Sequence, residues 1–149
     1  MLIGLSLKNA ISEEEEVKMD VILSVKPSYA YAILSGAKTV ELRRKFNEDI
    51  PQNSRVLIYA SSPIKALVGE CRIKKVTKDK PRSMWGKVAI ESLISWSAYR
   101  TYFASAEHAY AIHLEAPLKY DIAISLETLR KTYNIDPPQS YRYKPDVSL

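Results

Sequence analysis

The chain has 149 residues, of which 46% are hydrophobic and 26% are charged. This usage is ordinary for a globular protein, so we expect one domain that buries one sizeable core. No apolar stretch approaches the roughly 20 residues that span a bilayer, and the first residues do not resemble a signal peptide, which argues against membrane and secreted classes. We expect a cytoplasmic protein with no membrane partner.

The net charge of +5 favours a polyanionic partner, because each phosphate contact releases condensed counterions. A solvated, lysine-rich surface would explain the same charge. The single cysteine, Cys71, excludes an internal disulfide, and His108 and His113 lack the cysteine or carboxylate spacing of a zinc site. We therefore expect no metal and no other cofactor, and the oligomeric state is left open.

The first part of the chain, residues 1–18, contains four consecutive glutamates and only two lysines. Such a run of like charges, in a segment that has neither the alternation of a strand nor typical turn residues, predicts a mobile acidic leader. The domain itself is then expected to span residues 19–149.

The domain is predicted to begin with a strand at 20–25 (DVILSV), which alternates and is β-branched. A short helix follows at 27–35, because Pro27 suits a first helical turn and Gly36 suits the left-handed residue after a helix end. The next predicted strand, TVELRRKF, is followed by a surface loop with the turn residues NEDIPQNS.

Later segments add more strands than helices. Gly69 is expected to mark a bulge or a close backbone approach, and Ser125 is a candidate helix cap. The expected strands are 55–62, 66–78 and 108–116, the expected helices are 82–94, 96–103 and 125–133, and the prolines of 137–145 exclude a helix there. This order argues against a doubly wound parallel sheet and predicts an α+β fold, a small barrel or curled sheet decorated by helices.

One run, SGAKTVELRRK, concentrates charge where the first helix ends and the next strand begins. Thr39, Glu41 and Arg43 share one face of that strand because its period is two, and Lys38 lies at the turn. If this face lines a cleft, burial and its neighbours would shift the pKa of Lys38, and the cluster could bind an anion or transfer a proton. The alternative is a surface ion-pair ladder of little energetic consequence.

The segment GAKTVELR, Gly36 to Arg43, resembles the G-x-K-x-x-E-x-R signature of the ASCH domain, a family of the PUA-like superfamily. The flanking VILSVKPSYAYAILSG and RVLIYASSPIKALVGE are similar to the family's first strand and helix and its central hairpin. The closing PPQSYRYKP resembles a branch often called predicted transcriptional regulators. The resemblance covers about residues 20 to 145.

The resemblance implies a PUA-like small β-barrel, with helices packed beside a cleft that binds RNA or a modified nucleotide. Gly36 would be structural, Lys38 and Arg43 would meet a phosphate or base carbonyl, and Glu41 would accept hydrogen bonds. Regulation is a further expectation. Four more residues complete the predicted ligand site: Tyr29, Arg44, Ser61 and Ser62.

Some members of the family are enzymes, which supplies an alternative. One branch removes the acetyl group of 4-acetylcytidine with a Lys, a Thr and a Glu, and another is associated with RNA cleavage. Lys38 matches the lysine, but Glu41 stands at the threonine position, and a carboxylate can act only as a base or an orienting group. With Glu91 or Glu107 as a third residue, the alternative is a hydrolase of an acylated nucleoside or of single-stranded RNA. A partner-binding domain with a vestigial cleft is a third class.

Aromatic residues accompany the basic ones. Bases of single-stranded RNA stack on such rings, and the alternation of rings and cations in SYRYK suggests a nucleic-acid rim. Tyr29 and Trp85, at helical spacing with aliphatic residues, also fit a core. The predicted rim consists of Lys45, Tyr141, Arg142 and Tyr143, and further rings expected near the cleft are Tyr31, Tyr59, Tyr99 and Tyr102.

Overall fold

The computed structural model describes residues 20–144 and residue 149, and the predicted acidic leader, 1–18, lies outside them. Among the described residues, no helix is long and apolar enough to cross a membrane. The strands are β1 (Asp20–Val25), β2 (Val40–Arg43), β3 (Arg55–Ala60), β4 (Ala66–Asp79), β5 (Ala109–Ser125) and β6 (Tyr141–Tyr143). The helices are α2 (Pro27–Ser35), α3 (Pro81–Ser92), α4 (Trp96–Tyr102) and α5 (Leu126–Tyr133).

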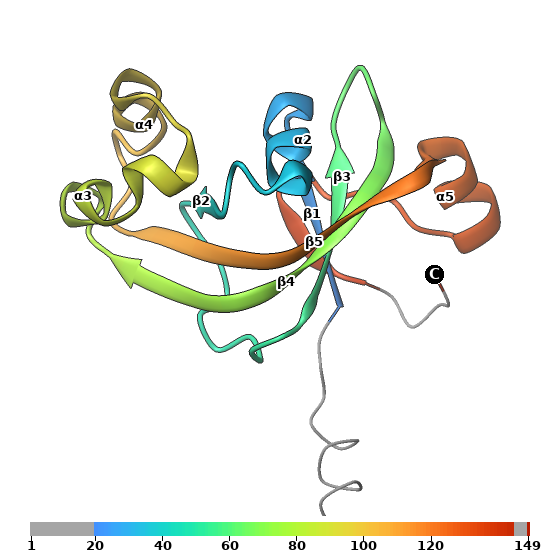
Figure 1. Ribbon diagram of the computed structural model, residues 1–149, viewed down its shortest axis with the longest axis horizontal. Helices are drawn as coiled ribbons and strands as arrows, with labels where there is room; N and C mark the ends of the chain where they lie inside the picture. Colours follow the sequence, from blue (N-terminus) through green and yellow to red (C-terminus); the bar gives the residue numbers. More distant parts are fainter. Residues whose placement is uncertain (1–19, 145–148) are drawn as a thin grey trace, which may run out of the picture.

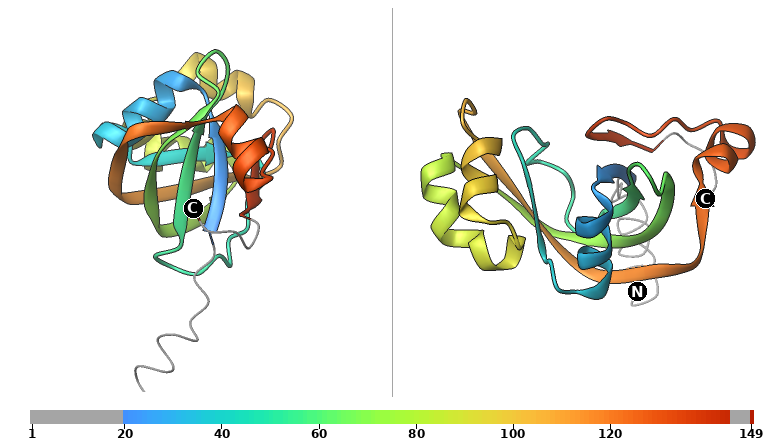
Figure 2. Two further views of the ribbon diagram at one scale, coloured as in Figure 1. Left: turned by 90° about the vertical axis from the view of Figure 1, so that its right-hand side faces the viewer. Right: turned by 90° about the horizontal axis from the view of Figure 1, so that it is seen from above.

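The six strands form one sheet in the order β2-β5-β4-β3-β1-β6. β1 pairs in parallel with β3, and the other neighbours are antiparallel. The long strands β4 and β5 curl across the molecule, with α3 and α4 at one end and α5 at the other (Figure 1). Seen from the side and from above, the sheet is a half-barrel (Figure 2). The predicted α+β fold with a curled sheet is confirmed.

The centre of the sheet is buried on both faces. In β1, Val21 and Leu23 belong to the core cluster under α2, whereas Ile22 packs with Leu129 of α5 in another cluster. A third cluster joins β2 to α3 and α4 through residues such as Leu42. Because strand residues alternate between faces, each helix covers its own side or end of the sheet. In β2, α3 and α4 cover the face that carries Leu42, and Glu41 lies on the opposite face.

Two strands exceed the sequence prediction. β5 continues beyond residue 116 to Ser125, past Ala116 in the left-handed region (φ 52°) and past Pro117. Residues 137–144, the described part of the segment 137–145, are not helical, as predicted, but they contain β6, which pairs with β1 at the edge of the sheet. Both elements depend on pairing with distant strands, which local patterns do not encode.

Gly69 lies at a bulge, where the register of β4 with both neighbouring strands shifts. A Cβ added there would be 2.5 Å from the Leu118 carbonyl oxygen of β5 and 2.6 Å from a methyl carbon of Leu34 in α2. The carbonyl belongs to the sheet backbone and cannot move independently. The predicted bulge and close backbone approach are therefore both present at this glycine.

Replacing Gly69 with alanine should lower the free energy of unfolding by about 1–3 kcal/mol, because overpacking forces side chains and backbone to shift. Gly86→Ala is the matched control, since a Cβ there meets nothing within 4 Å and Gly86 lies inside α3. Alanine in a helix interior should stabilise by about 0.5–1 kcal/mol. Urea unfolding measures both variants, and equal stabilities would contradict the close approach at Gly69.

Candidate functional site

The charged run after α2 folds into one buried cluster. Gly36 ends α2 in the left-handed region (φ 85°), and the chain turns directly into β2. Glu41 forms ion pairs with both cations: its carboxylate oxygens lie 3.5 Å from Lys38 Nζ and 2.8 Å from Arg43 Nη2, which also donates a hydrogen bond to it. The exposed fractions of Lys38, Glu41 and Arg43 are 3%, 6% and 9%. An exposed ion-pair ladder therefore does not describe these residues.

Arg43 connects the two edges of the curled sheet. Its Nη2 donates to the Ser24 carbonyl oxygen of β1 at 2.7 Å, and its Nη1 donates to Ser140 Oγ, just before β6, at 3.1 Å. β2 and β6 are the first and last strands of the sheet. The guanidinium thus bridges strands that share no backbone ladder.

Lys38 reaches a helix end and an aromatic ring. Its Nζ donates to the carbonyl oxygen of Ser92, the last residue of α3, where a cation complements the helix dipole. The same nitrogen lies 4.8 Å from the centre of the Tyr29 ring. Burial lowers the pKa of Lys38 from its ordinary value of 10.5, and the Glu41 carboxylate opposes that shift. Lys38 is therefore better able to release a proton than an exposed lysine.

The three motif side chains and Tyr29 line a cavity of about 260 Å³. Its walls also include seven residues outside the predicted ligand site: Ser24, Val25, Lys26, Leu42, Ile94, Ala98 and Tyr102. Tyr102 was among the rings expected near the cleft. Ser24, in the predicted first strand, and Lys26, directly before the predicted helix, were missed. The cavity therefore combines two tyrosine rings with three cations and a single carboxylate.

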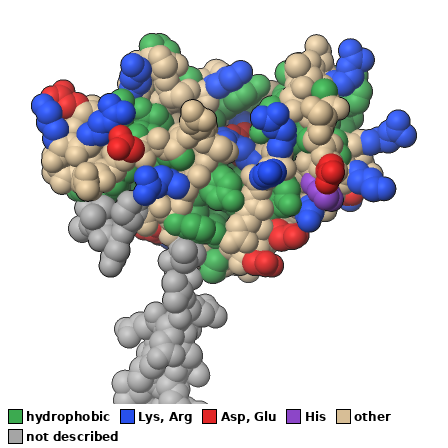
Figure 3. Space-filling model, turned by 180° about the vertical axis from the view of Figure 1, so that it is seen from behind, with side chains coloured by type: hydrophobic (Ala, Val, Ile, Leu, Met, Phe, Trp, Pro, Cys, Tyr) green, Lys and Arg blue, Asp and Glu red, His purple; other side chains and the backbone are tan. Residues whose placement is uncertain are grey.

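Arg44 and Lys45 lie in a neighbouring hollow of about 1020 Å³, which we call the outer hollow. Tyr102 lines both the cavity and the outer hollow, and the Arg44 guanidinium lies 4.7 Å from the centre of its ring. Tyr141 and Ser140 belong to the wall of the outer hollow as well. Basic side chains are also spread between apolar patches over the back of the molecule (Figure 3).

The other residues of the predicted rim lie in β6. Tyr141 and Tyr143 are half-buried: the Tyr141 ring lies 4.5 Å from that of Phe46, and the Tyr143 hydroxyl accepts from Asn47. Arg142 is exposed and donates to the Asp136 carbonyl oxygen at 3.2 Å. The two rings thus pack β6 onto the segment that follows β2.

The remaining candidates lie away from the cavity wall. Ser61 and Ser62 form the turn between β3 and β4, and neither lines the cavity. Glu91 and Glu107 are both exposed, and only Glu107 lines the outer hollow. Three more aromatic residues pack in the core between β2, α3 and α4: Trp85, Tyr99 and Phe103.

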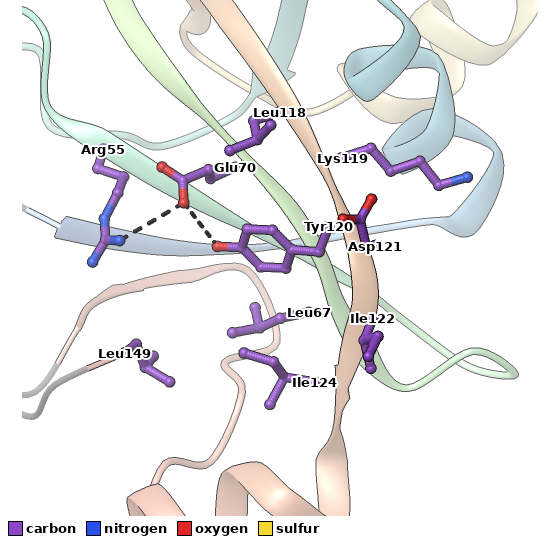
Figure 4. A pocket seen from close by; sticks show the side chains of 10 residues that line it. All are labelled: Arg55, Leu67, Glu70, Leu118, Lys119, Tyr120, Asp121, Ile122, Ile124 and Leu149. Carbon is purple, nitrogen blue, oxygen red and sulfur yellow. Dashed lines mark hydrogen bonds and ion pairs between the residues drawn. The ribbon is translucent and has the colours of Figure 1, made fainter.

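A different cavity, of about 470 Å³, lies beside β5 near α5. Figure 4 shows Glu70 between Arg55 and Tyr120, whose hydroxyl donates to the Glu70 carboxylate at 3.1 Å. Its charged residues, which also include Lys119 and Asp121, balance in sign. A set of charges balanced in sign offers a polyanion no advantage, so the cavity around Lys38 is the better candidate site.

Comparisons with known proteins identify the family and the fold of this chain. The family model described as ASCH domain matches residues 23–118. A Zymomonas mobilis protein named "ASCH domain-containing ribonuclease" is 32% identical over 127 residues, which cover 83% of this chain and 82% of that protein. The crystal structure of ASCH from Zymomonas mobilis superposes with a TM-score of 0.80 at 30% identity, covering 87% of this chain and 90% of that one.

A second relative is a much longer protein. The large ribosomal subunit protein uL22 of Ureaplasma parvum is 30% identical over 115 residues, which cover 76% of this chain but 36% of that protein. The similarity therefore concerns one part of the ribosomal protein.

The pKa of Lys38 should be measurable by NMR titration of its side-chain Cε, with a midpoint below 10.5. Because the unfolded chain still binds this proton where the folded chain has released it, the unfolding free energy should rise with pH between the two pKa values. Glu41→Gln should lower the midpoint further, because Glu41 raises the pKa of Lys38. Glu127→Gln on α5 is the control and should leave it unchanged, and a midpoint at or above 10.5 would contradict the burial argument.

Proposed function

Because the chain belongs to the ASCH domain family, we propose that it binds single-stranded RNA and takes one nucleotide into the cavity around Lys38, Glu41 and Arg43. The observation that carries the proposal is the composition of the cavity wall. The wall contains three cations, one carboxylate and the rings of Tyr29 and Tyr102. A nucleotide offers a phosphate for the cations, a ring face for stacking and amines for the carboxylate.

The size of the cavity favours an unpaired nucleotide. Its volume of about 260 Å³ lies near the lower end for ligand pockets, so it suits a single base with its sugar. Bases in a duplex are stacked and paired, and only single-stranded segments can turn a base out into such a cavity. The relatives named as a ribonuclease and as a ribosomal protein support an RNA partner.

A role in regulation, as the branch resemblance of PPQSYRYKP suggests, would need RNA binding without turnover. A modified nucleoside as the preferred ligand is the finer form of the same proposal. Both would use the same cavity, so the binding measurement below tests the step they share.

Lys38→Met should weaken binding of a fluorescent single-stranded RNA about tenfold at low salt, because a hydrogen bond to a charged group contributes roughly 1.5–3 kcal/mol. Lys26→Gln at the cavity wall should weaken it less, because Lys26 is exposed. Fluorescence anisotropy at several salt concentrations measures both effects. The matched control is Lys131→Gln on α5, which removes the same charge far from the cavity (Figure 1). Equal losses of RNA affinity in all three variants would show an effect of net charge alone and would contradict binding in the cavity.

A second candidate function, cleavage of the bound RNA, is favoured by the lowered pKa of Lys38. A lysine that is more readily neutral can act as a general base. The Nζ would take the proton of a 2′-hydroxyl, whose oxygen forms a bond to the adjacent phosphorus while the bond to the 5′ oxygen breaks. The leaving oxygen would take a proton back from Lys38 through water, and Arg43 would stabilise the charge on the phosphoryl oxygens.

If this second function holds, the cleavage rate should rise with pH through the pKa of Lys38, because the neutral amine is the active form. Lys38→Met should abolish cleavage, and a 2′-deoxy substitution at the cleaved position should block it in the unaltered protein. Mass spectrometry of the products, with and without Mn²⁺, makes the measurement, with Lys131→Gln as the control. Cleavage that survives both changes would remove Lys38 from the chemistry, and 4-acetylcytidine in the same assay tests the amidohydrolase alternative.

A further inference from the structure

The outer hollow is continuous in its wall with the cavity. Tyr102 lines both, and Ser140, which lines the outer hollow, accepts from the Arg43 guanidinium of the cavity. Arg43 and Arg44 are consecutive, so the chain passes from one hollow to the other at the end of β2. A ligand that fills the cavity would therefore extend into the outer hollow if it were longer than one unit.

The two cations of the outer hollow are exposed and uncommitted to carboxylates. No ion pair within the described part of the chain involves Arg44 or Lys45. Among the residues that line the hollow, Glu107 is the single carboxylate. The Arg44 guanidinium instead lies over the Tyr102 ring, at 4.7 Å from its centre. The hollow thus presents two available positive charges beside an aromatic platform.

We propose that the outer hollow is a second subsite of the same RNA site, which holds the nucleotides that flank the one in the cavity. This inference rests on the proposed RNA binding and adds to it the length and strandedness of the ligand. Arg44 and Lys45 contact backbone phosphates, and a flanking base stacks at Tyr102, where Arg44 already occupies one ring face. His108 and Ser105 add hydrogen-bonding groups to the wall.

The dimensions and charges fit this assignment. The outer hollow has a volume of about 1020 Å³ against about 260 Å³ for the cavity, so it has room for more than one nucleotide. Arg44 and Lys45 follow the buried motif directly in the sequence. An RNA backbone that leaves the cavity therefore reaches these two cations next. The site therefore binds a short single-stranded segment, and an isolated nucleotide fills only part of the site.

A length series separates the two hollows. Binding of a mononucleotide, a trinucleotide and a hexanucleotide RNA is measured by calorimetry on the full chain, at several salt concentrations. In the unaltered protein the affinity should rise at least tenfold from one to six nucleotides. The double variant Arg44→Gln/Lys45→Gln should lose that gain. It should also reduce the salt slope by about 1.4, since each phosphate contact in a single strand contributes roughly 0.7.

The chain offers a closely matched control in Arg130→Gln/Lys131→Gln. These are likewise a consecutive arginine and lysine, both exposed, on α5 at the opposite end of the molecule from α3 and α4 (Figure 1). Their pairs with Asp136 and Glu127 are surface pairs of little energetic value. This control should keep the length dependence of the unaltered protein.

Each contrary result has a distinct meaning. An affinity that does not change with length overturns the second subsite while the proposed binding in the cavity stands. An equal loss in both double variants shows a net-charge effect and also overturns the subsite. If the unaltered protein binds neither the mononucleotide nor the hexanucleotide, the proposed function fails and the second subsite fails with it.

Discussion

The bridge that Arg43 makes across the open side of the half-barrel is the interaction on which the remaining architecture depends. Six strands curl far enough to bring β2 near β1 and β6, but no backbone ladder joins these edges. The guanidinium supplies the missing link through the Ser24 carbonyl oxygen and Ser140. Glu41 balances its charge. A buried arginine without such partners would be strongly destabilising, so the closure and the ion pair form one unit.

The candidate site is a consequence of that closure. Because an arginine side chain, and no further strand, spans the gap, space remains between β2, the first turn of α2 and α4, and the cavity occupies it. Lys38 enters the same space from the turn after Gly36 and fixes the end of α3 through Ser92. The charges that hold the fold therefore line the cavity, and an anion that bound there would compete with Glu41 for its two cations.

Much of this was accessible from the sequence because it is local. Pro27 and Gly36 bound α2 as predicted, Gly69 lies at a bulge, and the period of two places Glu41 and Arg43 on one face of β2. What local patterns could not supply were partners distant in the sequence. The carbonyl oxygens that receive Lys38 and Arg43 are backbone groups of other segments, which residue identity does not encode. The pairing of β6 with β1, and the continuation of β5 past Pro117, likewise depend on tertiary contacts.

The bridging role of Arg43 also bears on how such a domain can diversify. A substitution at Arg43 or Glu41 would change the wall of the cavity and the closure of the sheet together, so these positions have little freedom to change. Tyr29, Tyr102 and Lys26 line the same cavity without joining strand edges. Changes in these wall residues would therefore alter the chemistry of the cavity while the charged motif continued to close the sheet.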